Sequence, residues 1–234
     1  MESVFEYRVL LWQGTLVTVQ LALSALVLAV VLGFAGAFAK RSPYRAARTL
    51  AGFYTTLVRG VPDLVLMMLL FYGGQQLLND LGTFTGWWDY VELDQFLAGT
   101  LAIGFVFGAY MTETFRGAFM AIPEGQLDAG RATGFSRTQL FTRVMWPQMV
   151  RHALPGFSNN WLVLLKATAL VSVIGLHDLV WNATTAGRSV REPFTFMFAV
   201  LLIYLLLTAC SDVLLRWLGR RYALHGVGAQ ERGI

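Results

Sequence analysis

The sequence predicts an all-α integral membrane protein, a bundle of five transmembrane helices that forms a single domain over residues 1–234. Only 14% of the residues are charged, and the mean hydropathy is +0.56. A soluble domain normally carries about 25% charged residues to cover its surface, so we expect the lipid bilayer to be the solvent. The ten-residue alternating segments of a transmembrane barrel are not seen in the sequence, which leaves helices as the spanning elements.

Five apolar segments have the roughly 20 residues that a helix needs to cross a bilayer. The first holds no charged residue and is too long for the apolar core of a signal peptide, so we expect it to stay as an anchor. Asp63 interrupts the second segment, and Lys166 lies inside the fourth. The expected spans are, in order, residues 9–39, 55–79, 95–115, 155–176 and 193–211.

The distribution of basic residues orients these spans, because cytoplasmic loops carry an excess of Lys and Arg. Five basic residues lie in residues 40–59, five in residues 113–151 and four in the C-terminal tail, which together are 14 of the 18. The loops between them are acidic or mixed. The N-terminus is therefore expected in the periplasm and the C-terminus in the cytoplasm.

Small residues recur at helical spacing in two of the spans. Ala29, Gly33 and Ala37 follow at i, i+4 and i+8, and Gly104 and Gly108 at i and i+4. Such spacing lets helix backbones approach closely in lipid, although glycine is also simply common in these helices. We expect the helices to pack into a bundle, within the chain or with a second chain.

The remaining composition argues against several function classes. The formal net charge is +4, but no basic run with interleaved aromatic residues appears, so nucleic acid is not an expected partner. His152, His177 and His225 are scattered, so no metal site is expected. No nucleophile is aligned with a base, so no enzyme chemistry is expected. Cys210 lies in an apolar run, which favours a packing residue over a reactive thiol.

Residues 124–150 differ from the apolar segments around them, because they carry carboxylates, arginines and threonines. Ser136 and Gln139 have the form of a capping box, in which two side chains satisfy free N–H groups at a helix start. They predict a helix from Arg137 to about Trp146, which Pro147 limits. The polar segment is thus expected to be helical rather than an irregular loop.

A shorter helix over residues 124–133 is expected to end at Gly134, because glycine most easily takes the left-handed cap conformation. The two helices would lie on the cytoplasmic side with one apolar face. That face could rest on lipid headgroups or fit a groove in a partner protein. It carries Leu140, Phe141, Val144 and Met145.

The same segment resembles the EAA signature of ABC importer permeases, which reads Glu-Ala-Ala, three residues, Gly, nine residues, then Ile-x-Leu-Pro. This chain keeps both spacers and departs by Asp for Glu, Gly for the second Ala, Val for Ile and Trp for Leu. In that family the loop is the coupling helix that docks into a cleft of the cytoplasmic ATPase. The resemblance implies a coupling loop over residues 121–153, with ATPase-coupling residues Asp128, Ala129, Gly130, Gly134, Val144 and Pro147.

Residues 54–73, 108–126 and 154–176 are also similar to the polar amino acid permeases. RGVPDLVLM, residues 59–67, resembles in particular the Q-type subunit of histidine and lysine/arginine/ornithine importers. The resemblance implies a type I importer permease in the bacterial inner membrane. Such a chain would move polar, above all basic, amino acids into the cytoplasm by alternating access.

The resemblance also implies partners. They are a dimer of cytoplasmic ABC ATPases, a second related permease chain and a periplasmic amino-acid-binding protein, with membrane lipid around the spans. The chain contains no G-x-x-x-x-G-K-[ST] phosphate loop, so ATP and Mg are expected on the partner ATPase and no cofactor on this chain. The acidic segment 80–95 either helps to dock the binding protein or is merely solvated.

Charged residues inside a span are costly, so each calls for a functional hypothesis. Gly60 and Pro62 are expected to break the second helix and to start a half-helix with Pro62 at its first position. Asp63 would then either complement the dipole of that half-helix or face a central cavity and attract a cationic amino acid, as broken helices do in transporters. Glu113 and Arg116, spaced i, i+3, form either a structural pair or a gate contact.

Lys166 has no obvious partner four residues away along its own helix. It would form an ion pair with Asp63 or Glu113 across the bundle, or line the substrate path. Asn160 and Thr168 are near enough in sequence to join it in a polar patch. Lys166, Asn160, Thr168 and Asp63 are therefore the substrate-path candidates.

Two other classes of protein remain as alternatives. A secondary transporter would explain the charges within the spans, but it would usually show more spans and internal repeats. A non-transporting membrane scaffold would explain the amphipathic helices, but it would leave Asp63 and Lys166 without a role.

Overall fold

The structure, a computed structural model, describes the backbone of residues 2–222 and the side chains of residues 3–220. The all-helical membrane fold is confirmed, because four helical segments in this range are long and apolar enough to cross a bilayer. A bent pair makes a fifth candidate if it counts as one span. The four are α2 (Arg8–Lys40), α6 (Gln95–Met120), the segment Arg137–Ile174 and α11 (Pro193–Tyr222).

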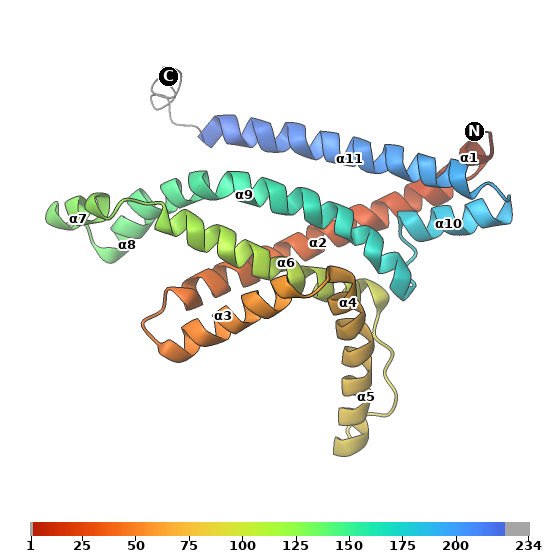
Figure 1. Cartoon of the computed structure of the whole chain (residues 1–234), viewed down its shortest axis with the longest axis horizontal. Coiled ribbons are helices and arrows are strands. Elements are labelled where there is room, and N and C mark those ends of the chain that lie inside the picture. Colours follow the sequence, from red (N-terminus) through yellow and green to blue (C-terminus); the bar gives the residue numbers. More distant parts are fainter. Residues whose placement is uncertain (1, 223–234) are drawn as a thin grey trace.

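The long helices run side by side along the longest axis of the molecule (Figure 1). The short helix α7 (Glu124–Ala132) lies at one end of this bundle. At the opposite end lie α1 (Glu2–Glu6) and α10 (Leu179–Ser189). The sequence did not indicate α10, which packs on both α2 and α11.

The most extensive packing joins α2 to α6. A Cβ placed on Gly33 would lie 2.5 Å from the Cβ of Met111, and one on Gly104 would lie 2.6 Å from a leucine side chain of α2. Ala29 and Ala37 are completely buried. The expectation that these small residues mark a helix–helix contact is therefore confirmed, and both helices belong to this chain.

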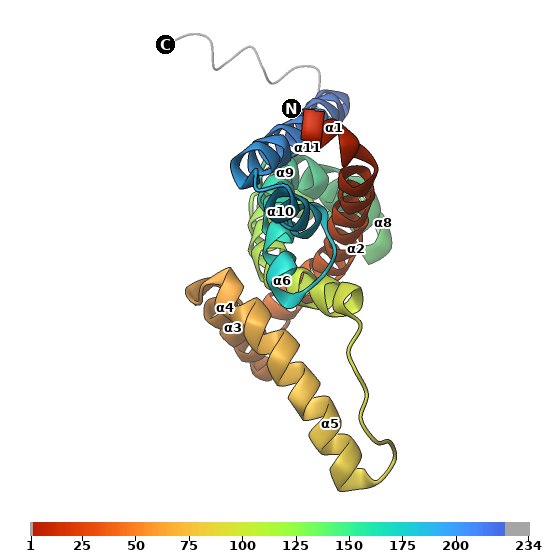
Figure 2. The ribbon, with the colours of Figure 1, turned by 90° about the vertical axis from the view of Figure 1, so that its right-hand side faces the viewer.

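The expected second span is broken at the predicted place. The chain bends by 113° between α3 and the helical segments that follow. Pro62 is the N-cap residue, so the half-helix begins one residue later than expected, at Asp63. Figure 2 shows the last helix after the break, α5 (Gly74–Thr85), projecting away from the bundle. The helical segments before and after the break are α3 (Arg45–Gly60), α4 (Asp63–Met68), the π-helical turn η1 (Leu69–Gly73) and α5.

The expectation that Pro147 limits the preceding helix is wrong. The helix continues through Pro147 into the fourth span without a break. Proline falls in the first turn of a new α-helix directly after a π-helical turn, where its missing N–H is tolerated. The consecutive segments are α8 (Arg137–Gln139), η2 (Leu140–Met145), α9 (Trp146–Ala167) and the 3₁₀ segment η3 (Thr168–Ile174).

The structure corrects the expectation for Cys210 and bears on the expectation that the histidines form no metal site. Cys210 is exposed on α11, so the expectation that it is a packed residue is wrong. Within residues 2–222, no group of three His, Cys, Asp or Glu side chains is placed to hold a metal ion. His225, which belongs to the same expectation, and the tail residue Arg232 lie outside the described residues.

Candidate functional sites

The first helix of the polar segment between α6 and α9 is α7, and Gly134 terminates it as the sequence predicted. Gly134 has a φ of +83°, in the left-handed region. The N–H of Phe135 donates to the carbonyl of Gly130, and the N–H of Gly134 donates to that of Arg131, each over 3.0 Å. These two bonds form a Schellman motif, which satisfies the last carbonyls of α7 and turns the chain toward α8.

Gly130 lets α7 lie directly against the helix that follows. A Cβ at Gly130 would lie 2.6 Å from Cδ1 of Leu140 and 4.0 Å from Cγ2 of Val144. Leu140 is only 8% exposed, because it covers the α7 backbone at this point. The departure from alanine in the EAA signature therefore makes room for a neighbouring side chain, and Gly130 and Val144 act as packing residues.

The predicted capping box is present. Ser136 Oγ accepts the N–H of Gln139 over 3.3 Å, and Gln139 Oε1 accepts the N–H of Ser136 over 2.9 Å. The apolar face behind it packs partly on the bundle of this chain. Phe141 packs on α2 and α6, with its ring centroid 6.5 Å from those of Phe38 and Phe119. The bundle itself covers this part of the face.

The outward face of the segment is polar. Asp128 and Arg131 form an ion pair over 2.6 Å, and their side chains are 68% and 63% exposed. Ala129, Gly134 and Pro147 are exposed as well. Exposed ion pairs hold their partners only weakly, so both side chains remain available to a partner. Of the six expected coupling residues, four lie on this accessible face and two lie behind it.

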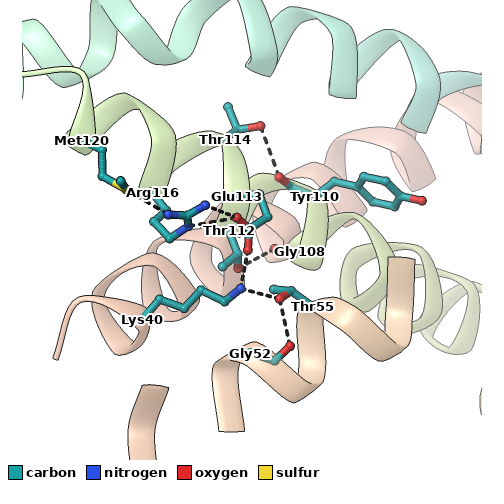
Figure 3. Close-up of polar contacts among 10 residues, drawn as sticks. All are labelled: Lys40, Gly52, Thr55, Gly108, Tyr110, Thr112, Glu113, Thr114, Arg116 and Met120. Carbon is teal, nitrogen blue, oxygen red and sulfur yellow. Dashed lines mark hydrogen bonds and ion pairs between the residues drawn. The ribbon is translucent and has the colours of Figure 1, made fainter. Parts of the chain in front are cut away.

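The predicted contact between Glu113 and Arg116 forms, and it is part of a larger cluster (Figure 3). Arg116 Nε donates to Glu113 Oε2 over 2.9 Å. Lys40, at the end of α2, pairs with the other carboxylate oxygen and also donates to Thr55 Oγ1 over 2.5 Å. The Lys40 and Glu113 side chains are only 17% and 19% exposed. Sequence spacing missed Lys40 and Thr55 because they come from two other helices, α2 and α3.

Asp63 is the first residue of α4, where its carboxylate lies at the positive end of the helix dipole. It is half-buried and makes no side-chain bond that caps the helix. The cavity beside it, lined also by Met67, Phe107 and Leu170, has a volume of about 10 Å³. That is roughly the room of one water molecule, so this chain alone offers no space for an amino acid there.

Lys166 forms no ion pair within the described residues, so the expected pair with Asp63 or Glu113 is wrong. Glu113 is already occupied by Lys40 and Arg116. The expected polar patch is also wrong, because Lys166 is exposed whereas Asn160 and Thr168 are buried. Their bonds go elsewhere: Asn160 Nδ2 donates to Thr114 Oγ1 on α6 over 2.9 Å, and Thr168 Oγ1 lies 3.2 Å from the Tyr204 hydroxyl on α11.

Asp178 is a buried polar residue that the sequence did not single out. It caps α10, with Oδ1 accepting the N–H of Trp181 over 2.8 Å, while Oδ2 is buried without a hydrogen-bond partner among the described residues. Burial raises the pKa of this carboxyl from 3.8 to about 6. The next residue, Leu179, donates its N–H to Thr18 Oγ1 over 3.2 Å, so this loop is fixed against α2.

The helical membrane fold and the polar segment over residues 121–153 define a class of protein. Residues 29–224 match the family described as binding-protein-dependent transport system inner membrane component. The matched range includes this polar segment, the bent pair α3–α4 and the charged cluster of Lys40, Glu113 and Arg116. The chain belongs to this family, so it is an inner-membrane permease component of a transport system and not an enzyme.

Similar proteins indicate which kind of transport system this permease resembles. The chain is 52% identical to the histidine/lysine/arginine/ornithine transport system permease protein HisQ of Salmonella typhimurium over 212 residues, which cover 91% of this chain and 92% of HisQ. HisQ of Escherichia coli is 50% identical with the same coverage. A crystal structure of an amino acid ABC transporter with histidines has a TM-score of 0.80 at 29% identity, covering 94% of this chain and 97% of its own. The predicted resemblance to a Q-type polar amino acid permease is confirmed.

Proposed function

We propose that this chain imports basic amino acids and that residues 121–153 receive the work of a separate ATPase dimer. The observation that carries the proposal is the folded coupling segment, whose polar face is exposed while its apolar face packs partly on its own bundle. Only three residues separate the end of α6 from the start of α7. A partner that displaces α7 would therefore act directly on a core span, with ATP and Mg bound by that partner.

The substrate class is inferred from two observations. The HisQ relatives are named for histidine, lysine, arginine and ornithine transport. Asp63 stands at the break between α3 and α4, where its negative charge would attract a cationic side chain. A periplasmic binding protein would deliver the amino acid, and the acidic segment 80–95 is one surface that could receive it.

We also infer that a second, related permease chain completes the path. The cavity beside Asp63 is too small for an amino acid, and the neighbouring positions Val65 and Leu69 on α4 and η1 are 53% and 66% exposed. A second bundle against this face would enclose a larger cavity. In that arrangement the bent pair counts as one of five spans, with the N-terminus in the periplasm and the C-terminus in the cytoplasm.

The docking role is tested by purifying the tagged chain gently from its native membrane and identifying the proteins that come with it. Gly134→Pro, which cannot adopt the φ of +83°, should lose the ATPase but keep the second permease. Gly134→Asn is the matched control, because asparagine tolerates the left-handed conformation, and it should keep both. A chain that purifies alone would contradict the proposal and favour a secondary transporter.

The substrate role of Asp63 is tested by uptake. Asp63→Asn should lower arginine uptake much more than glutamine uptake, because only arginine carries a side-chain charge for the carboxylate to attract. If both amino acids are affected equally, Asp63 does not recognise charge and serves the helix dipole alone.

A further inference from the structure

We propose that the Lys40–Glu113–Arg116 cluster, together with Thr55, links the coupling segment to the broken helix, and that Lys40 is a positioning residue for transport. The inference rests on the proposed function, since it needs an ATPase that moves α7. It assigns a role to a partly buried charged cluster that neither the substrate path nor the dock explains. Figure 3 shows its side chains converging from α2, α3 and α6.

One side of the link leads to the coupling segment. Glu113 lies seven residues before Met120, the last residue of α6, which is roughly 10 Å of helix. Arg116 bridges most of that length, because its guanidinium contacts both Glu113 and the sulfur of Met120, the latter over 2.8 Å. The α7 helix begins four residues after Met120. A displacement of α7 therefore reaches Glu113 through a short and stiff helix end.

The other side leads to the broken helix. Thr55 is 2% exposed and receives the second hydrogen bond of Lys40. Five residues further on, α3 ends at Gly60, and Asp63 follows at the start of α4. A Cβ at Gly52 or at Gly60 would meet no atom within 4 Å. These two glycines lie on the outer face of α3, whereas its inner face packs on α2 and α6, with Val58 1% exposed and the Tyr54 hydroxyl donating to the carbonyl of Phe105 over 2.5 Å. The Lys40–Thr55 contact is the charged part of this inner face.

Packing alone already holds α2 against α6 at this level. A Cβ at Gly36 would lie 2.2 Å from Thr112 Oγ1, one residue before Glu113. The charged pair is therefore not needed to bring these two helices together, and its distinctive contribution is the extension through Lys40 to α3. A charged contact that breaks in one state of the transport cycle and forms again in the other would supply the two-state element that energetic coupling requires.

The test uses the complete transporter, with ATPase, second permease and binding protein, in proteoliposomes. Arginine uptake and ATP hydrolysis are measured on the same vesicles, and the ratio of the two is the readout. Lys40→Gln removes the charge, Lys40→Arg keeps it, and Thr55→Val removes only the hydroxyl that joins α3 to the cluster. Thr184→Val on α10 is the matched control, since among the described residues its hydroxyl bonds only a carbonyl of its own helix.

We expect Lys40→Gln to lower arginine uptake per ATP about tenfold, and Thr55→Val about threefold, the size of effect that coupling mutations produce. Lys40→Arg should restore most of the ratio, and Thr184→Val should leave it unchanged. Uncoupling of this kind would not follow from a loss of folded protein, which lowers both activities together.

An unchanged ratio in Thr55→Val and in an assembled Lys40→Gln transporter would overturn the inference, whether or not the two activities fall together. If Lys40→Gln fails to assemble, Thr55→Val decides alone, because it keeps the ion pair and nearly the same shape. If the wild-type vesicles take up no arginine with ATP, the proposed function fails instead, so the two failures are distinguishable.

Discussion

Gly33 offers a direct test of how closely α2 and α6 must approach. A Cβ on Gly33 would lie 2.5 Å from Cβ of Met111 and 3.1 Å from its carbonyl carbon. Saturated carbons prefer about 3.5–4.0 Å, so the alanine methyl group needs α6 to retreat by about 1 Å. A Cβ and a backbone carbon cannot move away by side-chain rotation. The helix must therefore shift as a whole, and the tight contacts at Gly36 and Gly104 loosen with it.

Overpacking of this kind costs about 2 kcal/mol, which for a chain of this length corresponds to a Tm lower by about 4–8 °C. Gly117→Ala is the matched control, because Gly117 lies inside α6, the helix that Gly33 contacts, and its Cβ would meet nothing within 4 Å. Both variants gain the same helix propensity, so their difference reports packing alone. The assay is thermal unfolding of the purified protein in detergent. Equal Tm values for Gly33→Ala and Gly117→Ala would refute the close approach of the two helices.

Three further predictions follow from single residues. Asp178 should make stability depend on pH. Because burial raises the pKa of its carboxyl from 3.8 to about 6, about 3 kcal/mol of stability is fully present below pH 3.8 and is lost as the pH rises through about 6. The Tm should therefore fall as the pH rises across this range, and Asp178→Asn should make the Tm independent of pH there. Ser136→Ala should cost the capping box about 1 kcal/mol and speed amide exchange at Gln139 about fivefold, whereas unchanged exchange would mean that the cap is not formed in solution. Cys210→Ala should shift Tm by less than about 2 °C, because an exposed substitution changes stability by under about 0.5 kcal/mol, and a larger loss would show that Cys210 packs against a partner.

Local features were predictable because their causes lie within a few residues of each other. The capping box of Ser136 and the left-handed Gly134 depend on backbone chemistry that the sequence displays directly. The break at Gly60 and Pro62 has the same origin. The long apolar segments identified the membrane spans because the bilayer fixes their length. Pro147 was misjudged because a preceding π-helical turn, which the sequence did not indicate, lets the helix continue.

Contacts between distant parts of the chain were not predictable. Spacing paired Glu113 with Arg116, but Lys40 and Thr55 come from helices 73 and 58 residues away in sequence, and nothing local connects them. The faces of the fourth span were also misjudged, since Lys166 turned outward while Asn160 and Thr168 bond to α6 and α11.

The sequence by itself determined the solvent of this protein, its long apolar segments, the capping box and left-handed glycine of its polar loop and the family signature of that loop, because hydrophobic length, capping and turn chemistry are local properties. Only the tertiary structure decided which charges meet, which face of the coupling segment is exposed and how far the α3–α4 break bends. Those outcomes depend on the angles at which whole helices pack, and packing angles are set by many side chains at once.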